Sequence, residues 1–263
     1  MLPFYLFYSI ATSNLREIIT AAPQIVAAGI AIPILGVLLA WLILKILQKD
    51  FSPSHLNIVL FCILFANTGF IGFPICHALF GTTGLIYAIF YDLTLTLLTF
   101  IVGIWLLTGS TSKNSLRVLF NPIMVGSVAG LLWSGLNLPM PELLGAPLEM
   151  IGNATLPIAL LVAGIQVGVK REITGQTGFS IVFVAAFRLL IIPLIVLGVF
   201  RLIGWNNTIA AVIIMQAGMP VAISSTILAK RYQQDATFTA TATFWSTLAA
   251  MITLPLLALL IQL

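Results

Sequence analysis

Charged residues are scarce in this chain of 263 residues. Asp, Glu, Lys and Arg make up 7% of it, whereas hydrophobic residues make up 60% and the mean hydropathy is +1.16. A water-soluble globular protein of this length needs a much more polar surface. The scarcity therefore excludes a soluble protein. Apolar runs of about 20 residues, the length that crosses a bilayer, instead predict an all-α polytopic membrane protein.

Motifs for several chemistries are also missing. The sequence has no CxxC, no HExxH and no His cluster for a metal ion, and no GxxxxGK[ST] loop for a nucleotide. Cys62 and Cys76 lie in one helical run, too far apart to form a disulfide. A nucleophile–base pair or an acidic DxxD motif, which an intramembrane enzyme would need, is absent as well. We therefore expect no enzymatic activity, no metal, no cofactor and no nucleic-acid partner.

Polar breaks divide the chain into nine apolar segments. Their approximate ranges are 1–12, 21–47, 56–80, 84–107, 118–137, 144–168, 179–204, 207–231 and 237–261. The first segment is too short to span a membrane, whereas the others are long enough. The loops between them are short and leave no room for a soluble domain.

Basic residues fall in alternate loops. The eight on one side are Lys45, Lys49, Lys113, Arg117, Lys170, Arg171, Lys230 and Arg231. Arg16 and Arg201 lie on the other side, and Arg188 lies within a segment. Because cytoplasmic loops carry an excess of Lys and Arg, we expect the eight to be cytoplasmic and the C-terminus to lie outside. The expected location is the plasma membrane, such as the inner membrane of a bacterium.

The two halves of the sequence carry similar patterns. VAAGIAIPI at residues 26–34 resembles VAAFRLLIIPL at residues 184–194, five segments later. An odd offset reverses the direction in which the second copy crosses the membrane. This predicts two inverted repeats of about five helices, over residues 1–107 and 118–263, as in secondary transporters. The first copy then lacks its first helix.

Helix-breaking and polar residues interrupt two segments at matching places. They are Asn67, Thr68, Gly69 and Pro74 in segment 56–80, and Gln216, Gly218 and Pro220 in segment 207–231. Broken helices at membrane depth are viable only where protein or a watery cavity satisfies the freed backbone groups, and paired broken helices mark transporter substrate sites. Each restarted helix presents free N–H groups and partial positive charge, which suits a carboxylate. Alternatively, these residues only help the helices to pack.

Two ionisable residues lie inside apolar segments. Asp92 and Arg188 each cost roughly 2.5–3.5 kcal/mol at the centre of a membrane helix, so each needs a partner or water. Counted at about 1.5 Å per residue, their depths are similar and would allow an ion pair. Alternatively, Asp92 carries a coupling proton or a substrate charge. Asn153 is a further polar candidate for the cavity, with helix packing as the alternative.

Four stretches resemble the auxin efflux carrier family in its prokaryotic form. They are FANTGFIGFPICHALFG (65–81), NPIMVGSVAGLL (121–132), GNATLPIALLVAGIQV (152–167) and QAGMPVAISSTILAKRYQQD (216–235). The resemblance implies ten helices in two inverted repeats, whose fourth helices are broken and cross at the substrate site. It places Asn67 against the substrate carboxylate and Pro220 in the second crossover, and Ala66 stands where the plant carriers have proline. The family's first helix is missing.

The resemblance also implies a function. It indicates a secondary transporter of small organic anions, with carboxylates such as malate or malonate as expected substrates, that exports them by alternating access. Coupling to protons, to sodium or to neither stays open, as does a homo-oligomer. A sodium-coupled symporter of the bile-acid type is one alternative, although it needs more acidic and hydroxyl ligands at the breaks. An inactive transporter that lacks the family's first helix is another.

Overall fold

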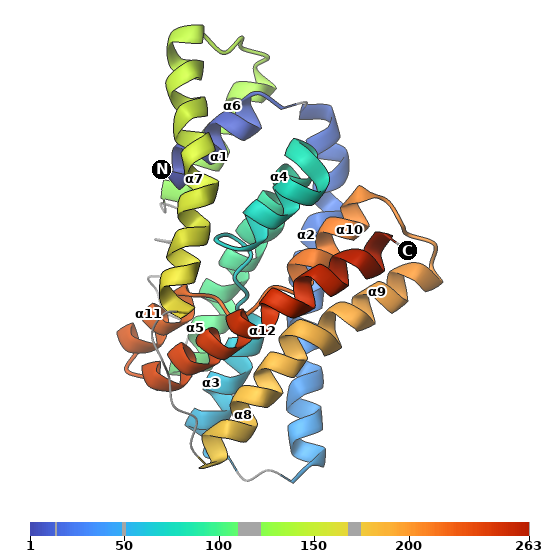
Figure 1. The fold of residues 1–263 in the computed structure, drawn as a ribbon, viewed down its shortest axis with the longest axis vertical. Coiled ribbons are helices and arrows are strands. Elements are labelled where there is room, and N and C mark those ends of the chain that lie inside the picture. Colours follow the sequence, from blue (N-terminus) through green and yellow to red (C-terminus); the bar gives the residue numbers. More distant parts are fainter. Residues whose placement is uncertain (14, 49–50, 110–121, 168–174, 263) are drawn as a thin grey trace.

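The computed structural model describes residues 1–13, 15–48, 51–109, 122–167 and 175–262 (Figure 1). Most of these residues are helical, and five helices are long and apolar enough to cross a membrane. By length and composition these candidate spans are Ile18–Ile46, Gly72–Thr108, Glu142–Val162, Gly178–Leu202 and Ala236–Gln262, and the second of them contains the turn at Gly81 described below. The prediction of an all-α polytopic membrane protein is confirmed.

Three helices form a group on one side of the molecule (Figure 1). They are α1 (Leu2–Ala11), α6 (Pro122–Gly135) and α7 (Glu142–Val167). α1 approaches α6 closely because glycines face it. A Cβ atom on Gly126 would lie 2.4 Å from the carbonyl oxygen of Pro3, and one on Gly130 would lie 2.8 Å from that of Phe7. Small residues allow such backbone contact between membrane helices, and we term these three helices the α7 group.

The other helices surround the two interrupted segments and are termed the core group. They are α2 (Leu15–Ile46), α3 (Pro53–Leu64), α4 (Gly72–Leu98), the π-helical turn η1 (Thr99–Gly103), α5 (Ile104–Thr108), α8 (Gly175–Ala186), the π-helical turn η3 (Phe187–Ile191), α9 (Ile192–Leu202), α10 (Thr208–Ala217), α11 (Ser224–Arg231) and α12 (Ala236–Gln262). α8, η3 and α9 follow one another without a gap and form one long helix. Cys62 and Cys76 are both buried in this group as free thiols.

Three helices of the core group begin at side-chain caps that the sequence provides. Ser52 precedes α3, Asn207 precedes α10 and Asp235 precedes α12. Each side-chain oxygen accepts a hydrogen bond from a first-turn N–H group, at 3.2, 3.0 and 2.8 Å respectively. Such caps satisfy backbone donors that have no partner within the helix. The half-helices that lead into the two interrupted segments, α3 and α10, therefore both begin at capped ends.

α4 is a helical hairpin rather than one long span. Gly81 has a φ of 65° and a ψ of −159°, so the helix ends and restarts there. In a straight helix, Gly69 and Asp92 would lie about 34 Å apart. A Cβ atom on Gly69 would instead lie 3.5 Å from Oδ1 of Asp92. The chain therefore reverses at Gly81, and the prediction of separate segments at 56–80 and 84–107 is confirmed.

The order of continuous helix, broken helix and continuous helix occurs twice. It runs from α2 to α5 and again from α8 to α12. The division into two inverted repeats over residues 1–107 and 118–263 stays a prediction. The segment between the predicted repeats lies largely outside the described residues, as do five of the basic residues that predict the orientation, namely Lys49, Lys113, Arg117, Lys170 and Arg171.

Candidate functional site

The first break (residues 65–71) lies between α3 and α4. α3 ends at Leu64, and Phe65 is extended, with φ −99° and ψ 103°. Helix resumes only at Gly72. Asn67 and Thr68, which lie within the break, are 3% and 0% exposed. The break therefore places polar side chains and irregular backbone inside the protein, where both need partners.

The second break (residues 218–223) lies between α10 and α11. Gly218 follows the last residue of α10, and a Cβ atom there would lie 2.6 Å from Cδ2 of Leu257 in α12. A side chain at this position would therefore require the end of the Leu257 side chain to move. Pro220 is buried in this break and has no N–H group to satisfy.

The two breaks cross and pair through their main chains. Ala66 and Val221 form an antiparallel bridge. The N–H of Asn67 donates to the carbonyl oxygen of Pro220 at 2.8 Å, and the N–H of Ala222 donates to that of Phe65 at 3.0 Å. This short ladder satisfies backbone groups that neither helix can satisfy. It also shows that the two breaks run in opposite directions where they meet.

Hydroxyl groups complete the hydrogen bonding of the second break. The N–H of Val221 donates to Oγ of Ser246 at 3.2 Å. The carbonyl oxygen of Ala222 accepts hydrogen bonds from Ser225 at 2.6 Å and from Thr243 at 3.3 Å. Ser246 and Thr243 belong to α12. Sequence reasoning missed these three residues. Thr243 and Ser246 lie in the hydroxyl-rich run ATFTATATFWST of α12, and Ser225 lies in α11. Hydroxyl side chains usually bond the carbonyls of their own helix, so they gave no signal for the crossing.

Asn67 and Gln216 both lie at the crossing, and each has an unpaired polar atom among the described residues. Nε2 of Gln216 donates to the carbonyl oxygens of Thr68 at 3.3 Å and of Ala88 at 3.4 Å. Oε1 of Gln216 and Nδ2 of Asn67 are buried and have no hydrogen-bond partner among the described residues. A Cβ atom on Gly72 would lie 2.2 Å from Oε1 of Gln216. Glycine at the start of α4 thus makes room for the Gln216 amide.

Asp92 lies beside the first break. Its Oδ1 accepts a hydrogen bond from Oγ1 of Thr68 at 2.5 Å, and Oδ1 is also its atom nearest to Gly69. The carboxylate is half-buried. Thr68 is part of the break. A change in the protonation of Asp92 would therefore act on the break through this hydrogen bond.

In the part of the chain that the structure describes, Arg188 bonds main-chain carbonyl groups rather than Asp92, so the structure does not show the ion pair that was one of the two alternatives. Its Nε and Nη2 atoms donate to the carbonyl oxygen of Met219 at 3.1 and 2.9 Å, and Nη1 donates to that of Ile63 at 3.1 Å. Similar depth in the membrane does not fix lateral position, and the two side chains meet different parts of the crossing.

The two remaining candidates, Pro74 and Asn153, differ in burial. Pro74 is buried in the first turn of α4, where its missing N–H costs no helical hydrogen bond. Asn153 lies on α7 with an exposed side chain, so the structure does not bring it to the crossing. Its neighbour Thr155 lines a small pocket of about 120 Å³ that also includes Gly69 and Phe70 of the first break.

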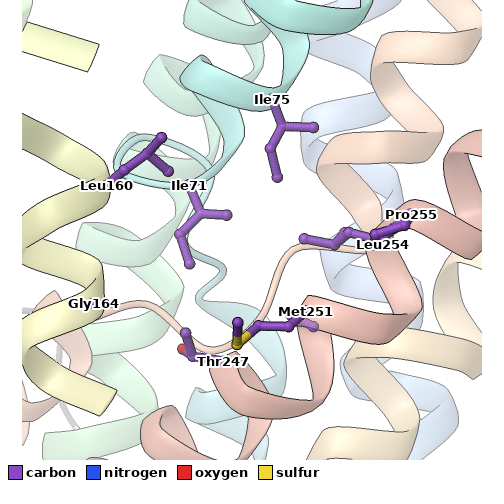
Figure 2. A pocket seen from close by; sticks show the side chains of 9 residues that line it. Ile71, Ile75, Leu160, Gly164, Thr247, Met251, Leu254 and Pro255 are labelled. Carbon is purple, nitrogen blue, oxygen red and sulfur yellow. The ribbon is translucent and has the colours of Figure 1, made fainter. Parts of the chain in front are cut away.

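A larger pocket of about 510 Å³ lies between α7, the start of α4, and α12. Figure 2 shows Ile71 and Ile75 on the α4 side, Leu160 on the α7 side, and Thr247 and Met251 on the α12 side. Thr247 is the only hydroxyl residue among the residues that line this pocket. The pocket therefore has an apolar lining and lies between the α7 group and the core group. Ile71, which belongs to the first break, forms part of its wall.

The sequence matches the membrane transport protein family over residues 1–258. An uncharacterized transporter of Methanothermobacter thermautotrophicus is 28% identical over 72% of this chain and 63% of its own length. The uncharacterized transporter MJ1031 of Methanocaldococcus jannaschii is 25% identical over 94% of this chain and 80% of its own length. Auxin efflux carrier component 1 of Arabidopsis thaliana is 27% identical over 51% of this chain and 22% of its own length.

The comparisons identify the family of this chain. The chain spans less than two thirds of the length of the Methanothermobacter relative, and the family match extends over nearly all of the chain. The relatives are described as transporters or carriers. The chain therefore belongs to the membrane transport protein family, the family of the auxin efflux carriers.

Proposed function

We propose that this protein is a secondary transporter of small organic anions, chiefly carboxylates, with its binding site at the crossing of the two breaks. The observation that carries this proposal is the buried Nδ2 group of Asn67, a donor without a partner among the described residues. An unpaired buried amide donor costs free energy. A carboxylate oxygen would accept its hydrogen bond and offset that cost.

Helix ends favour the same charge. α4 begins at Gly72, directly after the first break, and α11 begins at Ser224, directly after the second. The N-terminus of a helix carries roughly half a positive charge and free N–H groups. Two such ends at the crossing favour an anion there, and Thr68 and Gln216 add polar groups beside it.

The pocket beside Ile71 favours a particular shape of substrate. Its volume of about 510 Å³ is suited to a small organic molecule, and Thr247 contributes the hydroxyl of an otherwise apolar lining. A carboxylate with an apolar body would place its charge at Asn67 and its carbon skeleton in this pocket. Dicarboxylates, which the family resemblance implies, would place a second charge against apolar side chains and are the second candidate.

The position of the pocket supports the proposal of alternating access. α7 forms one wall, while α4 and α12 form the others. Movement of the core group against the α7 group would open this space to either side of the membrane in turn. Asp92 is our candidate for proton coupling, since it bonds Thr68. Export is the proposed direction because several relatives are named auxin efflux carriers.

Transient currents from proteoliposomes on a solid-supported membrane test the proposal. Rapid jumps of mono- and dicarboxylates should give currents with at least one anion. Asn67→Ala should abolish them, whereas Asn206→Ala, an exposed residue outside the crossing, should retain them. Currents that are unchanged in Asn67→Ala would show that the crossing is not the site. Silence with every anion would contradict the transport proposal itself.

A further inference from the structure

Arg188 is a charged side chain at the centre of the protein without a charged partner in the described part of the chain. It is 2% exposed and lies in η3, the π-helical turn between α8 and α9. Burying an unpaired charge is costly unless other groups stabilise it. All three hydrogen bonds of its guanidinium group go to backbone carbonyl oxygens. The partners of Arg188 are therefore main-chain dipoles.

The two carbonyl groups come from the ends of two different half-helices. Ile63 lies in the last turn of α3, whose carbonyl groups have no partner within the helix. Met219 lies two residues beyond α10, in the second break. Arg188 thus holds together the C-terminal end of one broken helix and the exit of the other. A planar guanidinium with several donors in fixed directions can bond both at once.

The charge of Arg188 matches the charge of these helix ends. The C-terminus of a helix carries roughly half a negative charge. Two such ends together carry about one negative charge, which one guanidinium offsets. The opposite ends, at the starts of α4 and α11, stay positive and available to an anion. The crossing therefore has an anion-facing side and a side that is already neutralised.

If Arg188 were absent, a metal cation could bind the negative helix ends that Arg188 now neutralises. In transporters with broken helices, unwound carbonyls and the C-terminal ends of half-helices are the groups that coordinate sodium. The carbonyl oxygens of Ile63 and Met219 are such groups, and the guanidinium occupies both. Arg188 and a sodium ion would compete for the same oxygens.

We propose that Arg188 is a tethered cation that takes the place of a sodium ion between α3 and the second break, so that this protein needs no sodium at the crossing. The proposal rests on the transport function proposed above, and it makes Arg188 a positioning residue rather than a substrate ligand. Removing the guanidinium should uncover carbonyl oxygens that a small alkali cation can stabilise.

Thermal unfolding of the purified protein tests this without any transport assay. The melting temperature of the unmodified chain should be the same in sodium chloride and in N-methylglucamine chloride at equal ionic strength. Arg188→Ala should melt roughly 10 °C lower in N-methylglucamine and recover a large part of that loss in sodium. Arg188→Lys, which keeps the charge, should not respond to sodium.

Arg201→Ala is the matched control. Nη2 of Arg201 donates to the carbonyl oxygen of Leu260 near the end of α12, so it too bonds a helix end, but it is exposed. Its replacement should produce no sodium dependence. Equal stability of Arg188→Ala in both salts would overturn the proposal. If Arg188→Ala does not fold, sodium-dependent stability or currents of the unmodified chain would overturn it.

The two proposals can fail separately. An unmodified chain that carries no anion, together with an Arg188→Ala variant that sodium stabilises, would refute the transport proposal and retain the tethered cation. Anion currents that require sodium would retain the transport proposal and refute the tethered cation. Anion currents that are equal in sodium and N-methylglucamine, with sodium-stabilised Arg188→Ala, support both.

Discussion

The two breaks cross each other but are satisfied in different ways. In the second break, Val221 and Ala222 bond hydroxyl side chains, and Met219 bonds a guanidinium. The first break keeps the amide nitrogen of Asn67 unpaired among the described residues and borders a pocket through Ile71. A closed set of hydrogen bonds makes one break a fixed support. The other break retains a donor that can bond a ligand.

The largest effect is expected for a substitution that adds a side chain at the start of α4, because it would disturb the place where the first break meets Gln216. A Cβ atom on Gly72 would lie 2.2 Å from Oε1 of the fully buried Gln216, so Gly72→Val should overpack the crossing at a cost of about 3 kcal/mol. We expect a melting temperature about 10 °C lower and loss of transport current.

The control for Gly72→Val is Gly164→Val in α7, where a Cβ atom would meet nothing within 4 Å. It should change the melting temperature far less. Combining Gly72→Val with Gln216→Ala removes the obstructing amide and should restore part of the stability. No recovery in the double variant would show that the clash is not with Gln216.

Removing the hydroxyl cap should affect the second break more than the first. Ser246→Ala leaves the buried N–H of Val221 without its partner, at a cost of about 2 kcal/mol, or about 5 °C in melting temperature. Asn67→Ala removes an amide nitrogen that has no described partner, so the melting temperature should stay nearly constant while transport is lost.

The control for Ser246→Ala is Thr243→Val. The carbonyl oxygen of Ala222 keeps its shorter hydrogen bond from Ser225 when Thr243 is replaced, so stability should change little. Scanning fluorimetry in detergent measures all of these variants. If Ser246→Ala and Asn67→Ala lowered the melting temperature equally, the second break would not be the support, and the first break the ligand-binding segment, as we propose.

A small effect on stability, like that of Asn67→Ala, is expected for Asp92→Asn. The amide oxygen can still accept the hydrogen bond from Thr68, so the cost should stay below about 1 kcal/mol. If Asp92 takes up the coupling proton, the currents of Asp92→Asn should lose the dependence on pH that the unmodified chain shows. Currents recorded between pH 5.5 and 8 check this, and an unchanged profile would place coupling elsewhere.

The positions at which the helices break could be predicted from the sequence, because the residues at these positions disfavour a continuous helix. Gly69, Gly218 and Pro220 interrupt apolar segments, and the structure leaves helix at each of these places. Gly81 ends its segment in the same way, with a positive φ. These residues act through backbone conformation, which depends on local sequence and needs no knowledge of neighbours.

The partners across the crossing could not be predicted, because they depend on lateral position. Arg188 and Asp92 have similar depths, yet one bonds carbonyl groups and the other bonds Thr68. Every residue has a backbone carbonyl, so nothing in the sequence indicated that the carbonyl of Ile63 would bond Arg188. Asn153, chosen for its polarity, lies on an exposed face of α7.

The main-chain ladder between Ala66 and Val221 joins residues that are made at very different times. More than 150 residues separate them in the chain. At a synthesis rate of 5–20 residues per second, Val221 is added roughly ten to thirty seconds after Ala66. Until then, the N–H of Asn67 and the carbonyl of Phe65 lack their final hydrogen bonds. The crossing is thus a late step of biogenesis, and a nascent chain stopped before the second break would still expose polar backbone to the insertion machinery.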